Sequence, residues 1–160
     1  NYGSACEEYN GTSWTAGGSL TEDSGRSYVA GFGTQTAGVA AGGYAQTGAT
    51  SNSEEYDGSS WTAGNNRNNP ASASSGTGTQ TAGLAVGIYP NSSNVEDGTS
   101  FSTKPSLANA LSSGASGGTS SSAFIAGGRG SPPGPTAGVT TTEEFTAETT
   151  GLNYKNISSS

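Results

Sequence analysis

The chain has 160 residues, of which only 29% are hydrophobic and 27 are glycine, and its net charge of −7 comes from 12 acidic and 5 basic residues. Such an acidic chain is a poor partner for nucleic acid or an anionic membrane surface. It contains no histidine and a single cysteine, Cys6, so no internal disulfide can form and the usual zinc, copper or iron sites are not expected.

The first predicted elements are short and polar. Cys6–Tyr9 and Ser13–Ala16 flank Asn10-Gly11, a dipeptide typical of tight β-hairpins. Further strands are expected at Arg26–Phe32 and, rich in small residues, at Ala37–Gly43. A polar loop at Tyr44–Ser51 then leads to a hairpin whose strands are Asn52–Tyr56 and Ser60–Ala63.

The sequence repeats this pattern. The text GTQTAGVAAGGY at Gly33–Tyr44 returns as GTQTAGLAVGIY at Gly78–Tyr89 and as GTSSSAFIAGGR at Gly118–Arg129. The later copies place strands at Pro70–Gly76, Ala82–Ile88, Ser93–Glu96, Ser100–Thr103, Asn109–Gly117, Ser122–Gly128, Thr140–Thr146 and Leu152–Asn156. Helix is expected at most in one or two turns of Pro105–Leu111, because glycine interrupts every other candidate window.

Each repeat therefore predicts four short antiparallel strands, which gives an all-β fold of about fourteen strands. A sheet of this size cannot bury its faces alone, so it must pack face to face against the next copy, and radial stacking leads to a ring. The small-residue strand that opens each unit, such as Ala71–Gly76, should lie innermost, where strands crowd towards the axis.

The unit resembles the kelch repeat of β-propellers. The resemblance is carried by paired glycines, an aromatic residue after acidic residues, and a tryptophan, with Arg26 and Arg67 ahead of the innermost strands. The repeat positions are Gly42, Gly43, Tyr9, Tyr56, Trp14, Trp61, Phe101, Phe145, Gly127 and Gly128. The resemblance implies about three and a half blades within a larger propeller or assembly. One repeat region, 1–160, divides into a partial blade at 1–25 and blades at 26–66, 67–104 and 105–160.

The repeat departs from the kelch pattern in places. Gly43 is replaced by Ile88 in the next copy, Tyr56 by Glu96 and Trp61 by Phe101. In the sequence of its repeat, with segments such as GTQTAG and EEYDGSSWT, the chain is also similar to kelch-like structural proteins of marine bacteriophages.

The two tryptophans, Trp14 and Trp61, have a structural and a functional interpretation. Because they recur at one register, we expect them between blades, as large contacts in a core made of Ala, Val and Gly. The alternative is lectin-like stacking on a glycan.

The acidic pairs do not predict catalysis. Glu7-Glu8, Glu54-Glu55 and Glu143-Glu144 are adjacent on strands, so their side chains point to opposite faces, whereas a glycosidase needs two converging carboxylates. The absence of histidine also excludes Ser-His-Asp and Cys-His nucleophile systems. Asp57, Asp97 and Glu96 could offer oxygen atoms to calcium, but no loop carries a dense acidic ladder. We expect no enzyme activity, no metal and no cofactor.

A recognition surface is expected in the connections that vary most between units, Tyr44–Ser51, Tyr89–Ser93 and Arg129–Val139. The candidate binding residues are Tyr44, Tyr89, Arg129, Pro132 and Pro133. The alternative is that these segments are inert connections.

Two functions follow. One is a bacteriophage virion component, such as a tail fibre, spike or head-decorating protein, whose partners are other virion proteins, identical subunits or a host cell-surface glycan. The other is a protein- or glycan-binding propeller module of a larger secreted or cell-surface protein.

The chain is not expected to close a ring alone. It supplies only the outer two strands of its first unit, and propellers close with 4–8 blades. Either several blades precede Asn1 in a longer polypeptide, which we favour, or identical chains complete one another.

Overall fold

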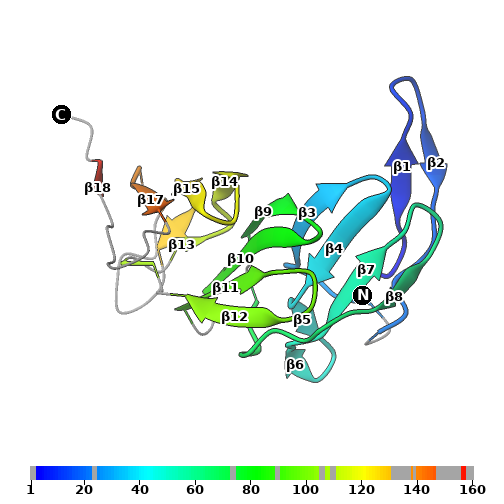
Figure 1. Cartoon of the computed structure of the whole chain (residues 1–160), viewed down its shortest axis with the longest axis horizontal. Coiled ribbons are helices and arrows are strands. Elements are labelled where there is room, and N and C mark those ends of the chain that lie inside the picture. Colours follow the sequence, from blue (N-terminus) through cyan, green and yellow to red (C-terminus); the bar gives the residue numbers. More distant parts are fainter. Residues whose placement is uncertain are drawn as a thin grey trace.

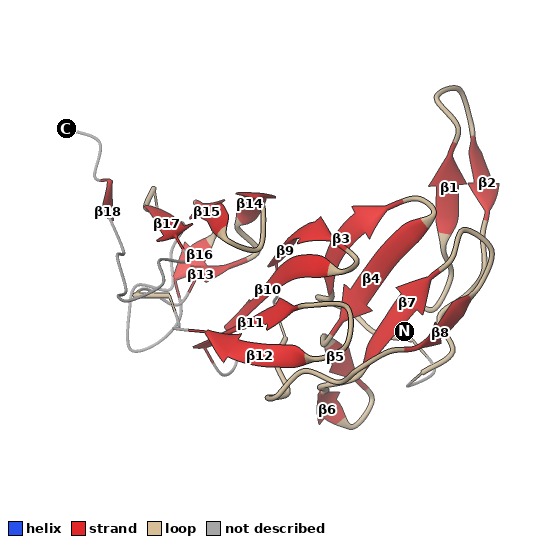
Figure 2. Ribbon diagram, in the orientation of Figure 1, coloured by secondary structure: helices blue, strands red, loops and turns tan. Residues whose placement is uncertain are grey.

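The computed structural model describes residues 3–22, 25–72, 75–88, 91–104, 107–108, 111–130, 138, 140–146 and 156–157. Within these residues the elements are strands, and all of their pairings are antiparallel (Figure 2). No described segment is a helix long and apolar enough to cross a membrane. The predicted all-β class is confirmed.

Three four-stranded sheets form the body of the molecule. Blade 1 contains β3 (Ala30–Thr34), β4 (Ala37–Ala41), β7 (Ser53–Tyr56) and β8 (Trp61–Ala63). Blade 2 contains β9 (Ser75–Thr79), β10 (Ala82–Ile88), β11 (Asn91–Glu96) and β12 (Phe101–Lys104). Blade 3 contains β14 (Ala115–Gly118), β15 (Ser122–Ala126), β17 (Thr142–Thr146) and β18 (Asn156–Ile157).

Shorter strand pairs accompany the blades. The N-terminal hairpin, β1 (Glu7–Tyr9) with β2 (Trp14–Ala16), stands beside blade 1. Two further pairs join two-residue strands, β5 (Tyr44–Ala45) with β6 (Gly48–Ala49), and β13 (Leu111–Ser112) with β16 (Arg129–Gly130). The predicted polar loop after Tyr44 therefore contains a small hairpin of its own.

The blades fan out from their first strands. Strand β9 lies against β3 on one side and β14 on the other, while the fourth strands β8, β12 and β18 lie on the outside (Figure 1). Hydroxyl groups bridge the inner strands, since Ser75 Oγ donates to Ser116 Oγ at 2.7 Å and Thr77 Oγ1 donates to the Gly118 carbonyl at 2.8 Å. The predicted order, with the first strand innermost, is confirmed.

The first strands begin later than predicted. The expected starts were Arg26, Pro70 and Asn109, whereas the strands start at Ala30, Ser75 and Ala115. Arg26 instead lies in the segment between the N-terminal hairpin and β3, where its side chain is buried. Most of the predicted helical turn at 105–111 lies outside the described residues, and Leu111 belongs to a strand.

The core lies between the blades. Ala30, Val39, Ala41, Ala85 and Phe101 form one buried cluster between blades 1 and 2, with Phe32 packed against it. The cluster between blades 2 and 3 contains Leu84, Val86, Leu107, Leu111, Ala123 and Ile125, with Phe145 against it. Each blade therefore has a back face, towards the preceding blade, and a forward face, towards the next one.

Candidate functional site

One end of the blades carries the connections that we predicted to bind. The second strand of each blade runs towards this loop end, which also holds the linkers entering each first strand. Tyr44 and Arg129 follow the second strands of blades 1 and 3 at equivalent positions, and both are exposed. Tyr89, Pro132 and Pro133 lie outside the described residues.

The Gly42–Gly43 pair ends the second strand of blade 1 and turns the chain into Tyr44. Both glycines have positive φ, 66° and 106°. The N–H of Gly43 donates to the carbonyl of Ala71, in the linker to blade 2, at 2.8 Å. Ser27 and Tyr44 exchange backbone hydrogen bonds at 3.0 and 2.8 Å, so the backbone of Tyr44 is fixed while its side chain stays 42% exposed.

A buried ion pair supports this turn. Arg26 Nη2 lies 2.9 Å from Glu54 Oε1, and both side chains are inaccessible to solvent. Arg26 Nη1 donates to the carbonyls of Gly42 at 3.2 Å and Asn52 at 2.6 Å. Because one guanidinium binds both sides of the connection, it fixes the base from which Tyr44 projects.

The Glu54 carboxylate also joins blade 1 to the N-terminal hairpin's linker. It accepts the backbone N–H of Thr21 at 2.7 Å and that of Glu22 at 3.1 Å. Arg67, from the following linker, is buried against Gly42, and burial lowers the pKa of its guanidinium to about 10. These three charged side chains are therefore buried, and they hold the turn that precedes Tyr44 in place.

Blade 3 repeats the turn with different chemistry. Gly127 and Gly128 have φ values of 64° and 98°. Ser112 Oγ donates to the Arg129 carbonyl at 3.0 Å, and the backbone of Arg129 also pairs with that of Gly138 in an isolated antiparallel β-bridge. A cationic side chain therefore stands in blade 3 where blade 1 presents a tyrosine.

Sequence reasoning missed Tyr28 at the same end. It is 65% exposed and has a φ of 56°, uncommon for an aromatic residue. It follows Ser27, which pairs with Tyr44, so two exposed tyrosines flank one bridge. The positive φ depends on tertiary context and leaves no signal in the sequence.

The expectation that both tryptophans are buried between blades is wrong for Trp14. Trp14 is 65% exposed and stacks on Tyr9 at 5.1 Å between ring centroids, whereas Trp61 is half-buried against Tyr56 at 4.9 Å. The larger contacts come instead from Phe101 and Tyr56, which are 5% and 4% exposed. Trp14 is exposed because no described strand lies behind the N-terminal hairpin.

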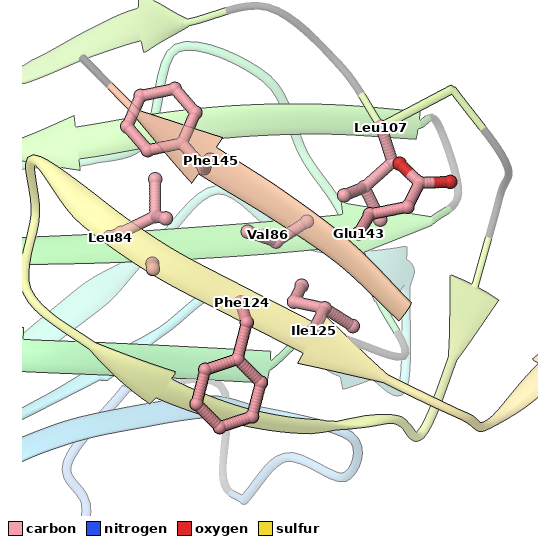
Figure 3. A pocket seen from close by; sticks show the side chains of 8 residues that line it. Leu84, Val86, Leu107, Phe124, Ile125, Glu143 and Phe145 are labelled. Atoms are coloured by element: carbon pink, nitrogen blue, oxygen red, sulfur yellow. The ribbon is translucent and has the colours of Figure 1, made fainter. Parts of the chain in front are cut away.

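The acidic pairs divide between two faces, as predicted. Glu54 and Glu143 are buried, while Glu144 is exposed. Glu143 lines a narrow apolar pocket between blades 2 and 3, where it accepts the Ala108 N–H at 2.8 Å (Figure 3). The described residues contain no group of three or more potential metal ligands.

An open groove of about 300 Å³ lies between the N-terminal hairpin and blade 1. Within it, Tyr56 donates its hydroxyl hydrogen to Glu8, which also accepts Gln35 Nε2 at 3.2 Å. The hydrogen bond to Glu8 and burial raise the pKa of Tyr56. These contacts hold the hairpin against blade 1.

No family model matches the sequence, and neither does any curated protein. Among solved structures, the chain is similar to YjhT, a kelch-repeat β-propeller protein, with a TM-score of 0.67 and 14% sequence identity. The match covers 89% of this chain and 49% of YjhT, so the chain spans about half the length of that protein. The predicted resemblance is therefore confirmed at the level of fold: the chain folds as a run of kelch-type β-propeller blades.

Proposed function

We propose that this propeller module is a non-enzymatic attachment protein that binds a ligand at its loop end, around Tyr44. The observation that carries the proposal is an exposed aromatic ring on a rigid base: Tyr44 is 42% exposed, while Arg26 and Glu54 beneath it are buried. Such a base reduces the entropy lost on binding, because the backbone is already fixed.

Neutral glycans fit this surface best. A tyrosine ring offers an apolar face for the C–H groups of a sugar and a hydroxyl for its polar edge. The net charge of −7 opposes the approach of anionic sugars. The buried carboxylates of Glu54 and Glu143 are engaged in structural hydrogen bonds, which supports binding without hydrolysis.

Soluble neutral oligosaccharides, titrated calorimetrically against the 160-residue chain, test the proposal. Tyr44→Ala should weaken binding at least about tenfold, which corresponds to ~1.4 kcal/mol. Phe124→Ala is the matched control, because that ring is 44% exposed but lies on a blade face. Equal binding by the wild type and Tyr44→Ala would contradict the proposal, as would steady release of reducing sugar.

A virion location is the more specific form of this function. It is supported by the resemblance of the repeat sequence to that of kelch-like structural proteins of marine bacteriophages. The chain should then be found on purified particles in a fixed ratio to the capsid or tail protein. Its absence from those purified particles would contradict this location.

A module within a larger secreted or cell-surface protein is the second candidate. It is favoured by the match to only 49% of a solved propeller chain. Detection on purified particles separates the two candidates. Intact-mass measurement of the denatured natural protein shows whether the 160 residues, which alone weigh 15.6 kDa, are part of a longer chain.

A further inference from the structure

We propose that Asn10 is a deamidation site, at which the backbone nitrogen of Gly11 attacks the side-chain amide and converts Asn10 to an aspartyl residue. The site is the turn of the N-terminal hairpin, between β1 and β2. Figure 1 shows this turn on the opposite side of the molecule from β5, which begins with Tyr44. The modification is therefore separate from the loop end and does not depend on the proposed ligand.

The reacting atoms are neighbours in the chain. A bond between Gly11 N and Asn10 Cγ closes a succinimide ring, so the reaction is intramolecular and needs no enzyme. Glycine has no side chain to hinder the attack, and the sequence contains no other Asn-Gly pair. Within the described part of the chain, no acceptor takes the Gly11 N–H. The nitrogen is therefore available to react.

The turn is open to the water and hydroxide ion that the reaction uses. Asn10 and Gly11 are exposed, and so are Asp57 and Asp97 at the equivalent turns of blades 1 and 2. Those two turns stay exposed although their blades pack against neighbours. Exposure of this turn is therefore a property of the repeat unit and does not depend on what lies beside the hairpin.

Two backbone N–H groups hold the side-chain oxygen of Asn10. Thr12 and Ser13 donate to Oδ1 at 2.9 and 3.0 Å. Negative charge develops on this oxygen when Gly11 N attacks, and donors that are already in place stabilise it. The leaving nitrogen, Nδ2, donates to Ser13 Oγ at 3.3 Å. The turn therefore both polarises the amide and places a hydroxyl group beside the nitrogen that must leave.

The reaction balances with water as its co-reactant. Hydroxide removes the proton from Gly11 N, which bonds to Asn10 Cγ, and the bond from Cγ to Nδ2 breaks. Nδ2 leaves as ammonia with a proton that the Ser13 hydroxyl relays from water, which regenerates hydroxide. Water then opens the succinimide at either carbonyl and gives aspartate or isoaspartate. No group is oxidised or reduced.

The equivalent turn of blade 1 shows that the aspartate product fits. Asp57 Oδ1 accepts the N–H groups of Ser59 and Ser60, both at 2.8 Å, in the pattern found at Asn10. The Ser60 N–H, followed by the hydroxyl and N–H of Ser59, lowers the pKa of Asp57 to about 2, so this carboxyl is ionised at neutral pH. A carboxylate resists attack by an amide nitrogen, so Asp57-Gly58 should persist where Asn10-Gly11 reacts.

Incubation of the folded 160-residue chain at mildly alkaline pH, followed by peptide mapping with mass spectrometry, tests the proposal. Asn10 should deamidate at least about threefold faster in the native chain than in the same chain unfolded in guanidinium chloride, which is the effect expected of one hydrogen bond in water. Asn52 is the internal control. Its Nδ2 donates to Glu22 at 2.9 Å and the buried Ser53 follows it, so it should stay intact in the native chain.

Ser13→Ala separates the folded turn from the local sequence. It removes the hydroxyl group beside Nδ2, so it should slow deamidation of Asn10 in the native chain by a similar factor and leave the rate in guanidinium chloride unchanged. A native rate in the wild type no higher than the rate in guanidinium chloride would overturn the proposal, whatever the variant does. Conversion of Asp57 to isoaspartate as fast as Asn10 reacts would also contradict it.

Discussion

Two neighbouring carboxyl groups at the end of β11 respond to the fold in opposite directions. Glu96, at the repeat position of Tyr56, is 2% exposed. Its Oε1 accepts the Gly98 N–H at 2.9 Å, while no described residue pairs with Oε2, and burial raises the pKa of this carboxyl. Asp97 is instead held ionised by the hydroxyl and N–H of Thr99 and the N–H of Ser100, which lower its pKa.

Glu96→Gln should stabilise the protein at pH 7 by about 1–2 kcal/mol, because it removes a buried charge and keeps the acceptor for Gly98. The folded pKa of Glu96 is raised, so the native carboxyl stabilises the fold fully only below its unfolded value of 4.5 and loses that contribution as pH rises. The advantage of the variant should therefore shrink towards pH 4. Urea unfolding at the two pH values measures it.

Asp97→Asn is the control, because its effect on stability at pH 7 should have the opposite sign. The folded pKa of Asp97 is lowered, so its contribution is present above the unfolded value of 3.8 and is lost as pH falls through the folded value. This variant should be less stable than the wild type at pH 7, with a smaller difference at pH 3. A Glu96→Gln variant less stable than the wild type at pH 7 would refute the assignment.

At the scale of elements, the paired glycines decide how a second strand ends. In blade 1, β4 stops at Ala41 and the chain turns at Gly42–Gly43. In blade 2 the second glycine is replaced by Ile88, and β10 continues through Ile88 and pairs directly with Asn91 of β11. The glycine pair therefore permits the longer connection that presents Tyr44.

Gly43→Ala should destabilise the protein more than Gly48→Ala. Both glycines have left-handed φ values, 106° and 116°, which cost a residue with a side chain about 1–3 kcal/mol. A Cβ at Gly48 meets open space, whereas one at Gly43 would lie 2.8 Å from the Ser27 carbonyl oxygen, which pairs with Tyr44. Thermal unfolding of the two variants measures the difference, and equal losses would show that the Ser27 contact is unimportant.

The repeat made the blade strands predictable, because each copy confirms the register of the others. The linkers could not be predicted in this way. Arg26 reaches Glu54 across 28 positions in sequence, and Arg26 and Arg67 meet the same Gly42 turn instead of taking equivalent places in two blades. Such contacts depend on tertiary distance and carry no periodic signal. Trp14 was misplaced for a related reason, since the repeat identifies the position but not whether a neighbour covers it.

At the scale of the whole molecule, the exposed fraction of the aromatic side chain at one repeat position depends on how completely the preceding blade covers it. Trp14, with no described strand behind it, is 65% exposed, and Trp61, behind which lies only the N-terminal hairpin, is half-buried. Phe101, in the buried cluster with residues of β3 and β4 of blade 1, is 5% exposed. The stabilising effect of this aromatic residue should therefore depend on its neighbour more than on its own size.

Alanine substitutions at the three positions should consequently destabilise the protein to different degrees. Phe101→Ala should cost about 3–5 kcal/mol at every protein concentration, because it empties an intramolecular core, and Trp61→Ala should cost less. Trp14→Ala should have the smallest effect of the three, because its ring is 65% exposed. Thermal unfolding of the three variants measures this order, and a loss for Trp14→Ala as large as that for Phe101→Ala would contradict it.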